Sequence, residues 1–198
     1  MKMLAFVDLH GDLNALSSLK KKIKRENVDL VLCAGDITIF GKKQKEILEK
    51  ISTFDVPVLI IHGNHELEES LHLDCEKFEN IIFLHSASVE INGVSFFGYG
   101  GGGFEQEDEL FRELTNHIEP MIESTSKKVF LVHGPPFGTL SDWTNKRHVG
   151  NKDYIDFILK NRIDLTICGH IHETAGTDEI IENSRIVNPG KSGITIDI

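Results

Sequence analysis

Two histidines one residue apart, His170 and His172, follow an apolar run that ends before Gly169. Side chains alternate between the two faces of a strand, so this pair in regular β conformation would present both imidazoles on the same side. Imidazoles bind divalent transition metals, and a pair aimed at one spot can supply two ligands. Two exposed loop histidines are the alternative, and the rest of the chain decides between these readings.

Ligand-type side chains also follow the other apolar runs. They are Asp8 and His10 after the first run, Asp36 after the second, Asn64 and His65 after the third, and His133 after a later one. Any one of them alone is more often a structural or turn residue than a ligand. In open α/β sheets, ligands bind beyond the carboxyl ends of the strands, so we expect these side chains to meet at one edge. Together they predict a metal site completed by His170 and His172.

The candidate ligands are too many for one ion. A catalytic zinc typically takes three protein ligands and keeps one open position. The residues that qualify here are Asp8, His10, Asp36, Asn64, His133, His170 and His172. Two ions that share a carboxylate fit this set, and its carboxylate, imidazole and amide ligands suit Mn²⁺, Fe, Zn²⁺ or Ni²⁺. Two-metal centres serve in-line displacement at phosphorus, so we predict phosphoester hydrolysis.

The elements that must position these residues alternate in the first half of the chain. Apolar runs at 3–8, 28–35 and 56–63 predict buried strands. Amphipathic patterns at 11–27 and around 47–51 predict helices between them. This alternation is typical of βαβ units and of a parallel sheet covered on both faces.

The second half is richer in strands, which the pattern predicts at 80–84, 88–91, 94–100, 128–134 and 164–170, with two or three closing strands that include 192–198. Helices are expected around 107–117 and 151–160, and Asn92-Gly93 predicts a tight turn. We therefore expect two packed sheets with helices outside, in a single domain spanning residues 1–198.

Composition and charge narrow the class of protein. Lys and Arg number 21 against 31 Asp and Glu, and the resulting net charge of −10 argues against a broad nucleic-acid surface. No apolar run reaches the length of a membrane span, and the first run meets a charge at Asp8, so we expect a cytoplasmic protein. Cys33, Cys75 and Cys168 lack C-x-x-C spacing, so we expect no disulfide framework, and Cys33 and Cys168, which end apolar runs, are expected to be core residues.

Residues 98–103 read G-Y-G-G-G-G. Glycine-rich loops can bind phosphate through backbone N–H groups. This one, however, lacks the Lys-Ser/Thr of a P-loop and does not open a helix after the first strand. We predict a flexible loop beside the site.

The order of these motifs resembles the calcineurin-like metallophosphoesterase superfamily. The blocks D-x-H, G-D, G-N-H-E, H-G and G-H-x-H are spread over residues 8–172. The resemblance implies a four-layer α/β/β/α sandwich and hydrolysis by a hydroxide that bridges two metal ions, with Mn²⁺ favoured. It places one ion on Asp8, His10, Asp36 and His172, and the other on Asp36, Asn64, His133 and His170.

The same resemblance implies roles around the ligands. Asp36 would bridge the ions, and His65 would stabilise the transition state or protonate the leaving oxygen. Glu66 would orient the His65 ring or contact the substrate, with a solvent-facing carboxylate as the alternative. In a later polar loop, His148 with Arg147 nearby is a candidate contact for a substrate phosphate, and a surface histidine is the equal alternative.

The substrate is the least constrained prediction. Segments 34–41, 63–66, 133–138, 148–150 and 169–173 are similar to the MPPED-type branch, which is associated with phosphodiesters, cyclic nucleotides included. After Asp36 the chain lacks the second Asp and the Arg of the protein Ser/Thr phosphatases, which disfavours a phosphoprotein substrate. We expect a small phosphodiester; a phosphomonoester substrate and a non-catalytic interaction scaffold are the alternatives.

Overall fold

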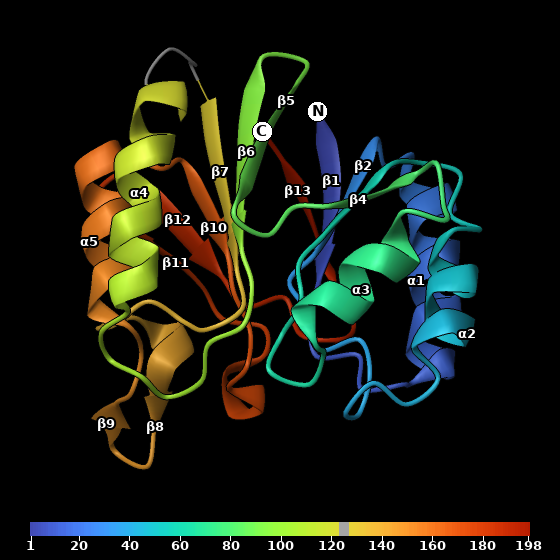
Figure 1. Cartoon of the computed structure of the whole chain (residues 1–198), viewed down its shortest axis with the longest axis horizontal. Coiled ribbons are helices and arrows are strands. Elements are labelled where there is room, and N and C mark those ends of the chain that lie inside the picture. The colour runs from blue at the N-terminus through green and yellow to red at the C-terminus, as the bar shows by residue number, and fades with distance from the viewer. Residues whose placement is uncertain (123–126) are drawn as a thin grey trace.

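The computed structural model describes residues 1–122 and 127–198, and the side chains of these except 119–122. Two sheets lie face to face, with α1, α2 and α3 outside one and α4 and α5 outside the other (Figure 1). This is the four-layer α/β/β/α sandwich that the sequence predicted.

The first sheet has the strand order β13-β1-β2-β3-β4. Its strands are β1 (Lys2–Phe6), β2 (Leu30–Cys33), β3 (Val58–Ile60), β4 (Ile81–Phe83) and β13 (Ile194–Asp197). Strands β1 to β4 are parallel, and β13 runs antiparallel to β1. The helices on this side are α1 (Leu13–Glu26), α2 (Gln44–Ile51) and α3 (Glu68–Cys75).

The second sheet has the order β11-β12-β10-β7-β6-β5. Its strands are β5 (Ala87–Ile91), β6 (Val94–Tyr99), β7 (Lys127–Val132), β10 (Leu165–Ile167), β11 (Asp178–Ile181) and β12 (Ser184–Val187). The four inner strands are parallel and the edge strands antiparallel. The predicted tight turn at Asn92-Gly93 joins β5 to β6, and α4 (Glu109–Ile122) and α5 (Lys152–Asn161) cover the outer face.

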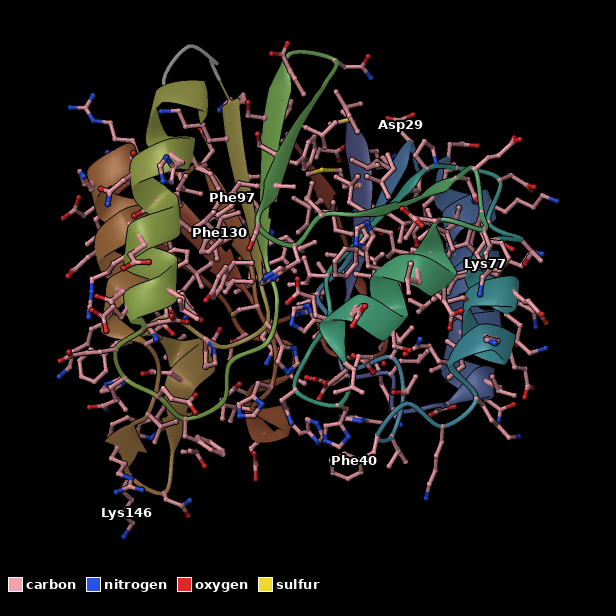
Figure 2. All side chains as sticks on the ribbon, viewed as in Figure 1. Asp29, Phe40, Lys77, Phe97, Phe130 and Lys146 are labelled. Atoms are coloured by element: carbon pink, nitrogen blue, oxygen red, sulfur yellow. The ribbon has the colours of Figure 1, made fainter. Side chains whose placement is uncertain are left out.

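Three apolar layers separate the four structural layers. In β1, Leu4 and Phe6 pack toward the helices, whereas Met3 and Ala5 face the second sheet. On the other side, Phe97 and Phe130 stack with ring centroids 5.2 Å apart between the second sheet and its helices (Figure 2). Each fully buried Leu or Phe contributes about 1.5–3 kcal/mol. Strands buried on both faces hold the loops at their ends in fixed places.

Some elements were not predicted. They are α3, the 3₁₀ turns η1 (Leu140–Asp142) and η2 (His172–Thr174), and the hairpin of β8 (Trp143–Thr144) with β9 (Arg147–His148). Two- and three-residue elements are too short for a periodic pattern, and α3 buries only three of its eight side chains, so it has no clear apolar face.

Two expectations about the chain as a whole can be compared with the structure. Cys33 and Cys168 are buried and unpaired, as predicted, and Cys75 is buried and unpaired as well. Within residues 1–122 and 127–198, no helix is both long and apolar enough to cross a membrane.

Candidate metal centre

The candidate ligands meet at one end of the sandwich, where the parallel strands of both sheets end. β1 starts at the upper end of Figure 1, so the loops after β1, β2 and β3 lie at the lower end, with η2 and the β8–β9 hairpin. The loops after β7 and β10 reach the same place from the second sheet. The predicted convergence of strand ends is what the fold produces.

The local backbone differs from what the sequence suggested. Strand β1 ends at Phe6 and β10 at Ile167, before their histidine motifs begin. Asp8, His10 and His170 have left-handed φ values of 55°, 45° and 70°. The prediction that each pair shares one face of a strand is therefore wrong, because sharp turns aim these side chains instead. Left-handed non-glycine residues are costly, and their clustering here marks a functional site.

The histidines of the H-x-H pair diverge. His170 Nδ1 lies 2.9 Å from Asn64 Oδ1, whereas His172 Nε2 lies 2.9 Å from His10 Nε2. The two rings thus serve two neighbouring positions rather than one spot. The divergence follows from the left-handed turn at His170 and the 3₁₀ turn that begins at His172.

The first of these positions is formed by Asp8, His10 and His172. One ligand atom from each lies within 4.8 Å of the others, and His172 Nε2 is 3.9 Å from Asp8 Oδ1. His10 Nδ1 faces the Thr38 carbonyl at 3.1 Å and donates to it, so His10 Nε2 keeps its lone pair. A backbone acceptor on one ring nitrogen is the usual support for a metal bond on the other.

The second position lies around the Asn64 amide oxygen. His133 is fully buried and donates from Nδ1 to the Ala34 carbonyl at 2.8 Å, which leaves its Nε2 lone pair 3.0 Å from Asn64 Oδ1. Two acceptor atoms repel each other at that distance unless a proton or a cation lies between them. With His170 Nδ1, this position offers a cation two imidazoles and one amide oxygen.

The Asp36 carboxylate stands between the two positions. It is 2% exposed, and its Oδ2 lies 3.6 Å from His10 Nε2 and 3.5 Å from His133 Nε2. These separations are too long for good hydrogen bonds. Ligand atoms that each bind one cation at about 2.0–2.2 Å are separated by comparable distances. The residues therefore fit divalent metal ions.

The pKa values of the carboxylates reflect burial set against the neighbouring rings. Burial alone would raise the pKa of Asp36, but contact with His133 and the charge of that ring outweigh it and lower the pKa to about 2. At Asp8, burial dominates and raises the pKa, partly opposed by His133. The low value keeps Asp36 ionised and ready to bind cations at neutral pH.

The pKa values of the two histidines at the second position, His133 and His170, shift in opposite directions. Burial, followed by repulsion from His133, lowers the pKa of His170 to about 4. Burial also acts to lower the pKa of His133, but the neighbouring Asp36 carboxylate prevails and raises it. A proton on His133 therefore competes with a cation, whereas His170 stays neutral near pH 7.

Two glycines of the motifs are required by close approaches around the centre. A Cβ on Gly63 would lie 2.0 Å from Asp36 Oδ1, and one on Gly169 would lie 2.2 Å from Val7 Cγ2. The first contact places the β3 loop against Asp36, and the second brings the β10 loop against β1. The G-N-H-E and G-H-x-H blocks need their glycines because backbone and ligands meet here.

His65 lies between the candidate ligands and an exposed aromatic ring. Its backbone N–H donates to Asp36 Oδ1 at 2.9 Å, and its Nε2 is 3.9 Å from Asp36 Oδ2. Its Nδ1 is buried without a hydrogen-bond partner among the described residues. Phe40, 74% exposed, stacks on the ring at a centroid distance of 4.3 Å and lies at the same lower end in Figure 2. Sequence analysis missed Phe40, whose only signal was an exposed aromatic shortly after G-D.

Glu66 is placed differently from the prediction. One carboxylate oxygen accepts from the backbone N–H groups of Asp36 and Gly63, and the other from the backbone and hydroxyl of Thr38. A buried carboxylate with four donors ties the β2 loop to the β3 loop. The carboxylate is buried, and its hydrogen bonds go to these donors rather than to the His65 ring, so the predicted role at that ring or at a substrate is corrected to a structural one.

Two pockets flank the candidate centre. The larger, about 600 Å³, is lined by His170 and His172, by the predicted contacts His148 and Arg147, and by Phe104. The smaller is about 400 Å³ and is lined by Asp8, His10, Asp12, His172 and Lys191, among others. His172 belongs to both. The glycine-rich loop ends beside the larger pocket, where Phe104 packs against His170 with ring centroids 4.7 Å apart.

Comparison with known proteins agrees with this architecture. The family profile for calcineurin-like phosphoesterases matches residues 1–174. A probable glycerophosphodiester phosphodiesterase, GpdQ, of Arcobacter nitrofigilis is 29% identical over 164 residues, covering 75% of this chain and 58% of the relative. The UPF0046 protein K07C11.7 of Caenorhabditis elegans is 25% identical, covering 89% of this chain and 65% of the relative. The chain thus spans about three fifths of the length of these relatives.

A solved structure shows the same fold. The protein TT1561 of Thermus thermophilus superposes with a TM-score of 0.79 at 17% identity, covering 96% of this chain and 90% of that chain. Family match, fold and clustered metal-binding side chains agree with one another. The chain belongs to the calcineurin-like phosphoesterase family.

Proposed function

We propose that this chain is a phosphodiesterase that acts on a small diester, with cyclic nucleotides as one class to test, through two divalent ions of which Mn²⁺ is favoured. Residues 1–198 would act as one domain. The ligands would be Asp8, His10, Asp36, Asn64, His133, His170 and His172, with Asp36 shared between the ions.

The observation that carries the choice of a diester is the pair of pockets that border the centre and share His172. A phosphodiester has two ester substituents, whereas a phosphomonoester has one. The pockets of about 600 and 400 Å³ share His172 and are otherwise lined by different residues. A phosphate bound between the two positions could therefore direct one substituent into each pocket.

Each group would have a defined task. Divalent ions bound by these residues would supply positive charge to the phosphoryl oxygens and would make a bound water more acidic and so a better nucleophile. His65 Nε2 faces Asp36 Oδ2 from the rim of the centre, and a proton on that nitrogen could pass to the departing ester oxygen. Asp36 accepts a hydrogen bond from the backbone N–H of His65, and this bond fixes His65 relative to the ligands.

The relative from Arcobacter nitrofigilis supports the same reaction class, since it is named a probable glycerophosphodiester phosphodiesterase. At 29% identity the name supports diester chemistry without selecting a substrate. The pockets, which belong to this chain, are the stronger argument.

The test is hydrolysis of bis-p-nitrophenyl phosphate against p-nitrophenyl phosphate. The protein is stripped of metal, reloaded with Mn²⁺ and assayed beside a His65→Ala variant purified in the same way, which controls for contaminating phosphatases. We expect a higher kcat/KM on the diester. A preference for the monoester would make the protein a phosphatase with the same site. Inactivity on both esters with metal bound would favour the non-catalytic scaffold.

A further inference from the structure

Outside the candidate metal centre, one fully buried carboxylate is bound directly to an imidazole. Asp142 is 0% exposed, and its Oδ1 lies 2.6 Å from His148 Nδ1. A buried carboxylate is costly unless it is fully hydrogen-bonded. This pair lies at the base of the β8–β9 hairpin, where Asp142 precedes β8 and His148 ends β9, and nothing in the proposed metal chemistry requires it.

The remaining acceptor positions of Asp142 hold the surrounding backbone. Its carboxylate also accepts from the N–H groups of Gly138, Thr139 and Gly150, at 3.0, 3.1 and 3.0 Å. These three donors and the ring are distributed two to each oxygen. The carboxylate therefore cannot turn without losing hydrogen bonds, and it fixes the orientation of the His148 ring.

Two aromatic rings hold the imidazole further. Trp143 contacts it edge-on at a centroid distance of 4.7 Å, and Phe137 lies 5.6 Å away. With Nδ1 bound to Asp142, Nε2 is the free nitrogen of a side chain that is 35% exposed and lines the larger pocket. A surface histidine, the alternative from sequence, needs neither a buried carboxylate nor an aromatic clamp.

The hairpin is also fixed relative to the candidate metal centre. Thr174, in the 3₁₀ turn that begins at His172, donates its hydroxyl to the Ser141 carbonyl at 2.8 Å. Ser141 directly precedes Asp142, and its own hydroxyl bonds that of Thr177 at 2.8 Å. Two hydrogen bonds thus join the loop that carries Asp142 to the loop that carries His172.

The charge of the pocket suits an anion. The protein has a net charge of −10, yet Arg147 and three histidines (His148, His170 and His172) line the larger pocket against a single carboxylate, that of Glu173. Lys146 projects at the tip of the same hairpin, at the lower left of Figure 2. Charged and imidazole N–H donors in such a place are typical contacts for phosphate oxygens.

We propose that Asp142 is a positioning residue and His148 the substrate contact it positions. Asp142 accepts a hydrogen bond from Nδ1, and in the form of the ring that carries a proton on each nitrogen, Nε2 donates to an oxygen of the phosphodiester whose substituent occupies the larger pocket. This inference rests on the proposed function and adds to it two residues outside the metal ligands.

The decisive comparison uses two substitutions, each of which keeps an N–H group near the place of one ring nitrogen. His148→Asn places an amide N–H near Nδ1, so it keeps the bond to Asp142 and removes the group that faces the pocket. His148→Gln places an amide N–H near Nε2 instead. We expect unchanged metal content in both and an unchanged melting temperature for His148→Asn, whereas His148→Gln leaves the buried Asp142 without one partner and should melt at a lower temperature. On bis-p-nitrophenyl phosphate, kcat/KM should fall about 10- to 100-fold for His148→Asn, chiefly through KM, and recover in part for His148→Gln.

Asp142→Asn tests the positioning role. It should lower kcat/KM by a similar factor and also lower the melting temperature, because an amide cannot accept from all three backbone donors. Rescue by added imidazole distinguishes a loss of ring positioning from a loss of folded protein. Added imidazole should restore part of the activity of His148→Gly, and restore none in the double variant that also carries Asp142→Asn. His117→Asn, at an exposed position on α4, is the matched control and should behave as the parent.

The outcomes separate this inference from the proposed function. If the parent cleaves the diester while His148→Asn stays within twofold of it, the contact is overturned and the proposed function stands. Activity that follows melting temperature alone across these variants would reduce Asp142 and His148 to structural residues, which also overturns the inference. A metal-loaded parent that cleaves neither ester would overturn both.

Discussion

The candidate metal centre and the base of the β8–β9 hairpin each contain a buried carboxylate beside at least one imidazole, but the distances differ. Asp36 Oδ2 lies 3.5 to 3.9 Å from the nearest nitrogens of His133, His10 and His65. Asp142 Oδ1 lies 2.6 Å from His148 Nδ1. Both carboxylates are almost completely buried. The first arrangement leaves room for a cation, and the second is a closed hydrogen bond.

The contrast separates two uses of the same side-chain types. Several imidazole nitrogens held just beyond hydrogen-bond distance of one carboxylate fit metal ions, because the ion takes the place of the missing hydrogen bonds. One imidazole bound tightly at Nδ1 has a fixed Nε2 for contact with another molecule. The following experiments test whether the two sites behave as differently as their geometry indicates.

Asp36→Asn should have the largest effect, because it removes a charge that faces both cation positions. We expect Mn²⁺ affinity to fall by more than the about 10- to 100-fold typical of residues behind the ligands, with turnover lost. Metal analysis after dialysis measures this. Asp156→Asn, at an exposed position on α5, is the matched control, and His148→Asn should keep its metal. Full metal content in Asp36→Asn would refute the shared-ligand assignment.

His65→Ala should come next. Its ring faces Asp36 from beside the ligands and is not needed to hold either cation position. We therefore expect unchanged metal content with kcat lower by roughly 10²–10⁴-fold, the range for a lost general acid. Steady-state kinetics on the diester measures the fall. Loss of metal from this variant would instead make His65 part of the ligand set.

A change of pH should weaken metal binding more moderately. The pKa of His133 is raised by the Asp36 carboxylate against the effect of burial, and that of His170 is lowered to about 4. As pH falls, His133 takes up a proton that a metal must displace, while His170 stays neutral. Between pH 8 and pH 6 we expect Mn²⁺ affinity to fall by up to about tenfold per pH unit. Titration calorimetry at several pH values measures it, and a pH-independent affinity would contradict this order of protonation.

Phe40→Ala should have the smallest effect. Phe40 stacks on His65 yet is 74% exposed, so it contributes to the position of the imidazole more than to the core. A contact of this kind is worth about 0.5–1.5 kcal/mol, or roughly a 2- to 10-fold fall in kcat. Melting temperature and metal content should stay unchanged. If kcat matches the parent, the stacking does not position His65.

Much of the architecture follows from local sequence. Alternation of buried strands and amphipathic helices predicts two layered sheets, because a parallel strand must be apolar on both faces. The order of the short motifs also predicted which side chains gather, since parallel strands end at a common edge. In the structure, Asp8, Asp36 and His133 place ligand atoms within 4.8 Å of one another although the chain separates them widely.

The tertiary structure decided how those side chains are aimed and what lies around them. No strand periodicity could show that His170 and His172 diverge, because left-handed and 3₁₀ turns set their directions. Glu66 reads as a site residue in sequence, but its hydrogen bonds go to backbone donors on two loops. The Asp142 contact depends on a two-residue-strand hairpin that leaves no periodic signal. Residue types and strand order are properties of the sequence, whereas the gap at Asp36 and the closed pair at Asp142 come from how packed layers hold their loops.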